Sequence, residues 1–148
     1  EYDVHDAEQM ARVLRTQVDV VLPDGVAVLH AADERIAAMA ELCDGDVILY
    51  AADAALPALA AHRARGGRAA FVRGGRLVFA QGADESVVGP MPEADGPAEA
   101  RRRRGLALLA GACAAWALGI TPELVASGLQ TFEPVPADGS GALTQLAY

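Results

Sequence analysis

Four consecutive arginines, Arg101 to Arg104, form the densest group of side chains in this sequence that could bind an anion. A guanidinium presents planar donors that fit a phosphate or a carboxylate, so the run predicts contact with phosphates or with an acidic partner. Four consecutive helical residues point in different directions, however, and cannot all converge on one ligand. The alternative interpretation is a solvated helix face that pairs with the acidic loop from Glu93 to Asp95.

His30 and Asp33 follow a short apolar run that is typical of a buried strand. Ligands of open α/β sheets bind at the carboxyl ends of the strands, where His30 could act as a general base. The simpler interpretation makes His30 a polar residue at a strand end and Asp33 the N-cap of the next helix. His5 and His62 have no partners at metal-ligand spacing, and Trp116 lies among alanines as a core residue would.

The N-terminal half predicts a strand–helix–strand unit. Strands are expected at 26–31 and 47–51, with a helix between them that starts at Asp33 and ends near Gly45. Such a unit has parallel strands and a right-handed crossover. Asp6, with Gln9 as capping-box partner, predicts an earlier helix. One face of that helix carries Met10, Val13, Leu14, Val18 and Val21, and it stops at the turn Pro23-Asp24-Gly25.

The C-terminal half predicts a hairpin followed by two helices. A helix over 54–65 precedes two strands, 68–72 and 76–80, which flank Gly74-Gly75. Residues 82–96 are expected to form a loop with a short edge strand at 86–88. A helix over 98–118 and a second one after Thr121-Pro122-Glu123, carrying Leu124, Val125, Leu129 and Phe132, complete one α/β domain over 1–132, followed by a loop or tail at 133–148.

Composition excludes some function classes. The chain has 148 residues, 53% of them hydrophobic, and a formal net charge of −8, which disfavours binding to nucleic acid or to an anionic membrane. Cys43 and Cys113 form no CxxC motif, so we expect two reduced, buried thiols, with one disulfide as the alternative. The apolar stretch 106–120 is too short to span a bilayer, and a cytoplasmic protein is expected.

Four segments, taken in order, resemble cyanophycin synthetases. The segment 13–29 is similar to the family's sequence after its catalytic-domain helix, and 30–50 to its "NADD" strand-to-helix corner and next strand. The segment 66–82 is similar to the family's hairpin, and 114–132 to the helix pair that ends the central domain of Mur ligases. The resemblance implies a partial Mur-ligase-like central domain, its second half.

The resemblance further implies that the parent protein is an ATP-dependent amide ligase. Cyanophycin synthetases build a polymer of aspartate and arginine, and their Mur-like part joins arginine to the aspartate side-chain carboxylate through an acyl phosphate. ATP and Mg²⁺ are the implied cofactors, and the implied partner is the remainder of the ligase chain or a second copy of this one.

Key parts of the family's nucleotide site are missing from this sequence. It contains no lysine and no GxxxxGK[ST] loop, which in the family lies upstream. The family's two adenine-contacting positions fall on Arg104 and Ala107, neither of which offers the amide group of the family's Asn or Gln. The Asn and the first Asp of the corner are His30 and Ala32 here, and only Asp33 is kept. Either this half-site is degenerate, or the register of the long helix is shifted by one turn.

Two functions therefore compete. The first is a segment of an amide ligase that needs flanking sequence, so that the isolated chain has no catalytic residue, no metal ligand and no cofactor of its own. The second is a non-catalytic module, derived from such a ligase, whose alanine-rich helices support self-association or a partner. A third, a nucleic-acid binder using Arg101 to Arg104, is disfavoured by the net charge.

Overall fold

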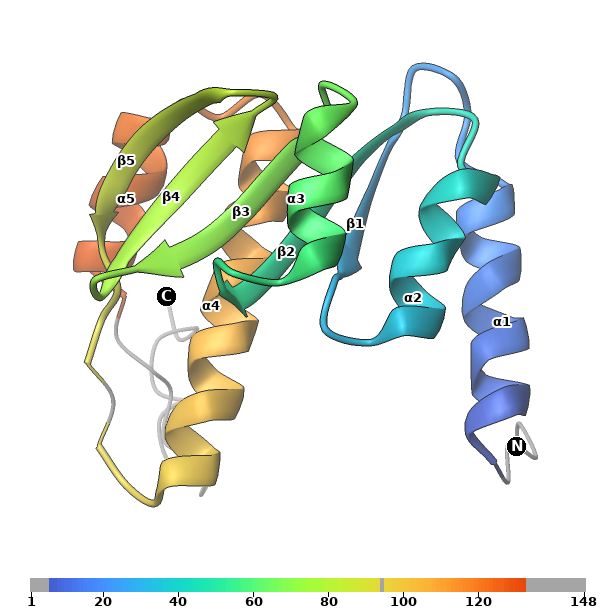
Figure 1. The fold of residues 1–148 in the computed structure, drawn as a ribbon. Helices are drawn as coiled ribbons and strands as arrows, with labels where there is room; N and C mark the ends of the chain where they lie inside the picture. The colour runs from blue at the N-terminus through green and yellow to red at the C-terminus, as the bar shows by residue number, and fades with distance from the viewer. Residues whose placement is uncertain (1–5, 94, 133–148) are drawn as a thin grey trace, which may run out of the picture.

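A five-stranded mixed sheet organises the residues described by the computed structural model, which are 6–93 and 95–132 (Figure 1). The strands follow one another across the sheet in chain order. Their bounds are β1 Val26–His30, β2 Asp46–Asp53, β3 Arg68–Arg73, β4 Arg76–Gln81 and β5 Asp84–Pro90. The expected tail at 133–148 and His5 lie outside the described residues.

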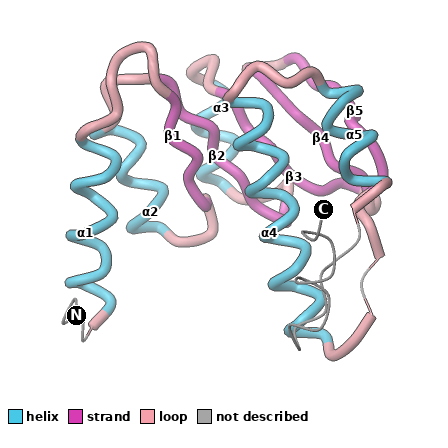
Figure 2. Tube along the Cα trace, turned by 180° about the vertical axis from the view of Figure 1, so that it is seen from behind, coloured by secondary structure: helices cyan, strands magenta, loops and turns pink. Residues whose placement is uncertain are grey.

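Helices cover both faces of the sheet, as Figures 1 and 2 show from opposite sides. The elements α1, α2, η1 and α3 belong to one face, and α4 and α5 to the other. Their bounds are α1 Ala7–Asp19, α2 Glu34–Ala38, the 3₁₀ helix η1 Met39–Leu42, α3 Pro57–Ala64, α4 Ala98–Ala117 and α5 Pro122–Gln130. The predicted α/β class, with a parallel βαβ unit, a hairpin and two C-terminal helices, is confirmed.

The parallel half contains β1, β2 and β3. β2 pairs in parallel with β1 on one side and with β3 on the other, and the β1–β2 register runs from Val26 opposite Asp46 to His30 opposite Tyr50. β2 is buried along most of its length because its apolar run meets helices on both faces. Asp33 caps α2 as predicted, its Oδ1 accepting from the Arg35 amide at 3.0 Å.

The antiparallel half begins at the predicted hairpin. Gly74 and Gly75 both have positive φ, 56° and 72°, the conformation that a two-residue type I′ turn requires. The short edge strand expected at 86–88 within the loop 82–96 is confirmed as part of β5, but the strand is longer than expected and pairs with β4 along 84–90. An edge strand tolerates charged residues since one side of it faces water, which is why Asp84 and Glu85 can belong to this strand although their charge is typical of a loop.

Two hydrophobic cores lie on opposite faces of the sheet. Leu29, Leu59 and Phe71 belong to the core shared by α1, α2 and α3. Leu109 and Cys113 of α4, both 0% exposed, belong to the core on the other face.

Some side chains predicted to pack are exposed. On α1, Met10 and Val13 are 46% and 44% exposed. Leu124 of α5 is 64% exposed, and Phe132, which follows the end of α5, is 48% exposed. The helix expected from residue 54 starts only at Pro57, since proline disfavours helical geometry in the residue before it.

Candidate functional site

The two positions that correspond to the family's adenine contacts, Arg104 and Ala107, line one groove between α4 and α5. The groove has a volume of about 570 Å³. Its lining is almost entirely apolar; besides these two positions it includes Leu108, Gly111, Ile120, Leu124 and Phe132. Arg104 and Ala107 lie one turn apart on α4, and the tertiary structure adds exposed apolar side chains such as Leu124 of α5 to the same groove.

Arg104 and Ala107 do not offer the side-chain donor and acceptor groups that recognise the edge of an adenine base. Ala107 has no side-chain donor or acceptor, and the Arg104 guanidinium only donates. An adenine edge presents both a donor and an acceptor, so a side-chain amide would fit it and this pair does not. The chemistry of the lining suits an apolar contact better than a base.

The arginine run is dispersed around the first turns of α4, as four consecutive helical residues must be. Arg102 Nε donates to Glu99 Oε2 at 3.0 Å, and Arg103 Nε to Glu99 Oε1 at 2.9 Å. Glu99 therefore takes the role that was expected of the acidic loop, and the hydrogen bond from Arg102 is the main cause that lowers the pKa of Glu99. Arg101 is exposed and has no ion pair within 6–93 and 95–132. The solvated-face interpretation fits this arrangement.

His30 and Asp33 lie at the carboxyl end of β1, away from the α4–α5 groove. The His30 ring is 5.2 Å from that of Tyr50, at a tilt of 34°. Asp33 is committed to capping α2. Among the described residues there is no group of three or more His, Cys, Asp or Glu side chains able to hold a metal ion.

The other residues considered for chemistry have structural surroundings. His62 is buried, and its Nε2 lies 3.2 Å from the Val47 carbonyl oxygen. Trp116 stacks on Phe79 with ring centroids 4.3 Å apart, and the Arg68 guanidinium lies 5.1 Å from its ring.

Both cysteines are free thiols in the structure. Cys113 is buried as expected, and burial raises the pKa of its thiol to about 12. Cys43 is only half-buried, which corrects the expectation of two buried thiols.

Among the described helices none is both long and apolar enough to cross a bilayer.

The lining of the α4–α5 groove does not fit ATP and Mg²⁺. Phosphate binding needs converging amide donors and a cation, and Mg²⁺ needs oxygen ligands. The sequence has no lysine, and the groove lining contains no carboxylate. No catalytic step is therefore assigned to these groups in this chain.

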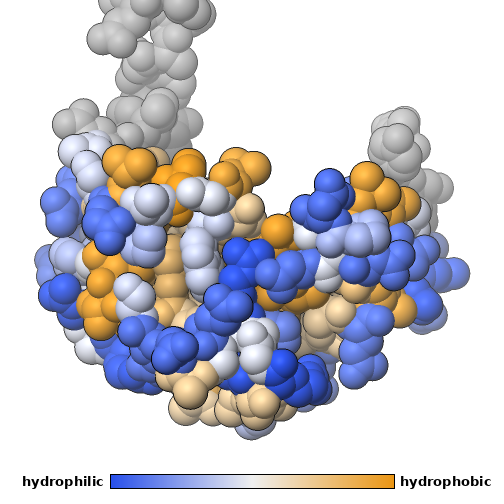
Figure 3. Space-filling view, turned by 90° about the horizontal axis from the view of Figure 1, so that it is seen from above, coloured by the Kyte–Doolittle hydropathy of each residue, from blue (hydrophilic) through white to orange (hydrophobic). Residues whose placement is uncertain are grey.

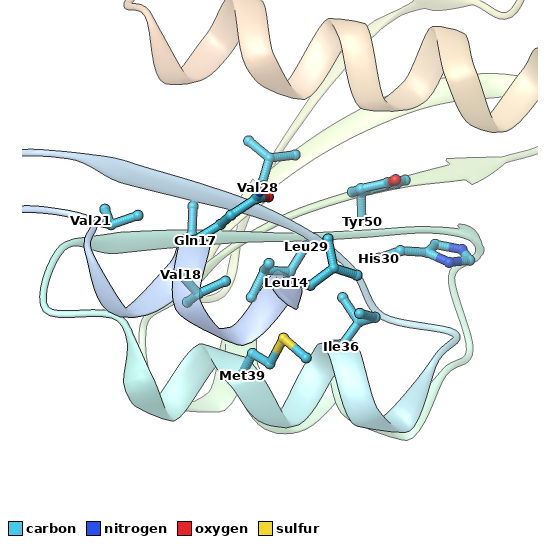
Figure 4. A pocket seen from close by; sticks show the side chains of 11 residues that line it. Leu14, Gln17, Val18, Val21, Val28, Leu29, His30, Ile36, Met39 and Tyr50 are labelled. Atoms are coloured by element: carbon cyan, nitrogen blue, oxygen red, sulfur yellow. The ribbon is translucent and has the colours of Figure 1, made fainter. Parts of the chain in front are cut away.

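A second cavity, beside β1, was not anticipated from the sequence. It has a volume of about 370 Å³ and is lined by α1, α2 and both sides of β1 (Figure 4). In Figure 4, Leu14 and Met39 lie with Leu29 on one side of β1, whereas Val28 and Tyr50 lie on the side of α4. Burial is the main cause that raises the pKa of Tyr50. The one feature of the sequence that pointed toward this cavity was the apolar face predicted for α1.

Comparison with known proteins gives one informative match. No protein-family model matches the chain. It is 32% identical over 136 residues, 88% of its length, to a cyanophycin synthetase from Synechocystis sp.. The matched part is 15% of that relative, so the chain spans only a small share of the relative's length. Together with a mixed sheet that is consistent with part of a Mur-like domain, this match shows that the chain is related to a segment of that cyanophycin synthetase.

Proposed function

We propose that this chain is a segment of an ATP-dependent amide ligase that resembles cyanophycin synthetase. In that proposal the Mur-like part of the parent protein adds arginine to the side-chain carboxylates of aspartate in a polymer. The chain's own contribution is structural, as the second half of the Mur-like central domain. The observation that carries the proposal is the 32% identity to a cyanophycin synthetase over nearly the whole chain.

The isolated chain is proposed to be inactive. Arg104 and Ala107 are the only candidate nucleotide positions, and they line an apolar groove without a side-chain amide. A triphosphate would also need cations and backbone donors that converge on it. The arginines of the run 101–104 are spread around α4, and two of them, Arg102 and Arg103, are paired with Glu99.

Calorimetry on the isolated chain tests this inactivity. Titration with ATP and Mg²⁺ is expected to give no measurable heat of binding. A micromolar dissociation constant would refute the proposed inactivity, and density for a nucleotide beside Arg104 in soaked crystals would refute the degenerate half-site.

The ligase proposal is tested in the polypeptide encoded by the complete gene. That polypeptide is expected to carry a GxxxxGK[ST] loop upstream of Glu1 and to release phosphate only when arginine and an aspartate-containing acceptor are both present. Replacing the loop lysine by alanine should abolish phosphate release, and the unchanged chain is the matched control. A complete gene that encodes no such loop would refute the ligase proposal.

A second candidate function, a self-associating module, is favoured by one observation. The α4–α5 groove exposes Leu124 and Phe132, which are 64% and 48% exposed. Exposed apolar surface of this kind commonly marks an interface. Sedimentation of the isolated chain tests it: Leu124→Glu should abolish a dimer formed through the groove. Leu118→Glu, at an exposed position outside the groove lining, should leave the dimer intact. A monomer at all concentrations would remove this candidate.

A further inference from the structure

The two edges of the sheet differ in how they are protected. β5, at one edge, carries Asp84 and Glu85, and its pairing with β4 shifts register between Leu77 and Val78. Charges and irregular pairing are the usual means by which proteins keep an edge strand from pairing further. β1, at the other edge, has the sequence Val-Ala-Val-Leu-His, without a charged residue, proline or register shift. Among the described residues, β1 is paired on one side only.

The helices indicate what belongs beside β1. α2 connects β1 to the adjacent parallel strand β2, and α3 connects β2 to β3, both on the same face of the sheet. A helix in a right-handed crossover packs over the strands that it connects. α1 lies on that same face and leads into β1. By the same geometry the position of α1 is the one that a helix takes when it covers β1 together with a parallel strand one position farther out.

The direction of the chain agrees with this geometry. α1 and β1 run in opposite directions, so that α1 begins at the end of the sheet where β1 finishes (Figure 1). A strand parallel to β1 would therefore finish at the start of α1 and could enter it through a short connection.

The cavity beside β1 has the shape that such a strand requires. Its lining includes Leu29 on one face of β1 and Val28 on the other, so it wraps around the free edge. From α1, Leu14 and Val18 contribute apolar side chains. Seen from above, the surface is hollowed between the part that carries α1 and the larger part that carries the other strands (Figure 3).

We propose that the free edge of β1 is an acceptor site for an extended, apolar polypeptide strand that runs parallel to β1. The strand is the stretch of the parent protein that leads into α1, and in this the inference rests on the proposed function. Its backbone bonds to the free N–H and C=O groups of β1, and its side chains alternate between the α1 side and the α4 side. Since both sides are apolar at β1, apolar residues are required at consecutive positions, as in β2.

A fusion protein tests the acceptor site without any nucleotide. A second copy of the β2 sequence, residues 46–53, is attached upstream of Glu1 through a short Gly–Ser linker; this copy is a suitable probe because β2 already pairs with β1 in parallel. Tethering raises its effective concentration to the millimolar range. Hydrogen exchange of the β1 amides that do not bond to β2 should then slow by about tenfold or more relative to the unfused chain.

Two matched controls separate strand pairing from other effects. A fusion in which the copy carries proline at the position of Leu49 should give no added protection, because proline lacks the N–H and is excluded from central strands. Within the fused protein, Leu14→Glu places a charge in the cavity and should remove the protection. Val13→Glu, one residue away at a 44% exposed position outside the cavity lining, should retain it.

Three results would overturn the inference. The first is unchanged exchange at β1 in the fusion, and the second is protection at β5 instead. The third is a dimer of the unfused chain in which β1 pairs antiparallel with its own copy. The comparison of the fusion with its proline control needs no change in the chain itself, so it remains decisive if Leu14→Glu fails to fold. Hydrogen exchange is measured without ATP. The exchange result at β1 can therefore be interpreted even if the complete gene product proves not to be a ligase.

Discussion

Replacing Gly45 by alanine should destabilise the fold strongly, because two loops meet there backbone to backbone. A Cβ at this position would lie 2.4 Å from the Gly25 carbonyl oxygen and 2.5 Å from the Leu22 carbonyl oxygen. Neither oxygen can easily move. Leu22 accepts from the Gly25 amide at 2.8 Å, and Gly25 accepts from the Asp46 amide at 3.0 Å. The methyl group would force apart the loops that lead into β1 and β2.

The magnitude follows from overpacking of this kind, which typically costs about 1–3 kcal/mol. Since both obstructing atoms belong to the backbone, we expect the upper end, about 3 kcal/mol. For a chain of this size such a loss lowers the melting temperature by about 6–12 °C. Urea unfolding followed by far-ultraviolet circular dichroism measures it as a lower midpoint at an unchanged slope.

Gly111→Ala is the matched control, because the same change should have the opposite sign. A Cβ at Gly111 meets no atom within 4 Å, and the residue lies inside α4, where alanine is favoured over glycine by about 1 kcal/mol. The variant should therefore unfold at a higher urea concentration than the natural chain. Equal midpoints for Gly45→Ala and the natural chain would refute the close approach of the two loops.

Two further predictions follow from burial and charge. At pH 8 a thiol reagent should label Cys43 in the folded chain and both cysteines in urea, and rapid labelling of Cys113 in the folded chain would contradict its burial. Burial raises the pKa of the Cys113 thiol from 9.0 to about 12. The contribution of this buried thiol to stability is therefore full below pH 9 and is lost as the pH rises toward 12. Glu85 has a lowered pKa, chiefly because it accepts a hydrogen bond from Arg73 and also because it pairs with Arg63. Glu85→Gln should therefore cost less than about 1 kcal/mol at neutral pH. This cost should disappear as the pH falls through the lowered pKa, and a cost that persists in acid would exclude the ion pairs as its source.

The sequence determined the elements whose cause is local. Asp6 and Asp33 accept hydrogen bonds from the first turns of their helices, as their types and positions predicted. Gly74-Gly75 specified a two-residue hairpin because that turn needs two positive φ angles. The alternation of apolar runs with helices was enough to predict the parallel unit and the α/β class. The identity of the candidate positions Arg104 and Ala107 also came from the sequence.

The tertiary structure decided the features that depend on what lies across space. The sequence indicated only a short edge strand at 86–88, and the full extent of β5 follows from its pairing with β4 along 84–90. The α4–α5 groove exists because α5 leaves Leu124 exposed instead of burying it. The acceptor edge of β1 is likewise invisible in its sequence, since an apolar strand is predicted equally well in the middle of a sheet and at its border. Periodicity reports which side chains avoid water, whereas the identity of the neighbour that covers them is set by packing between distant segments.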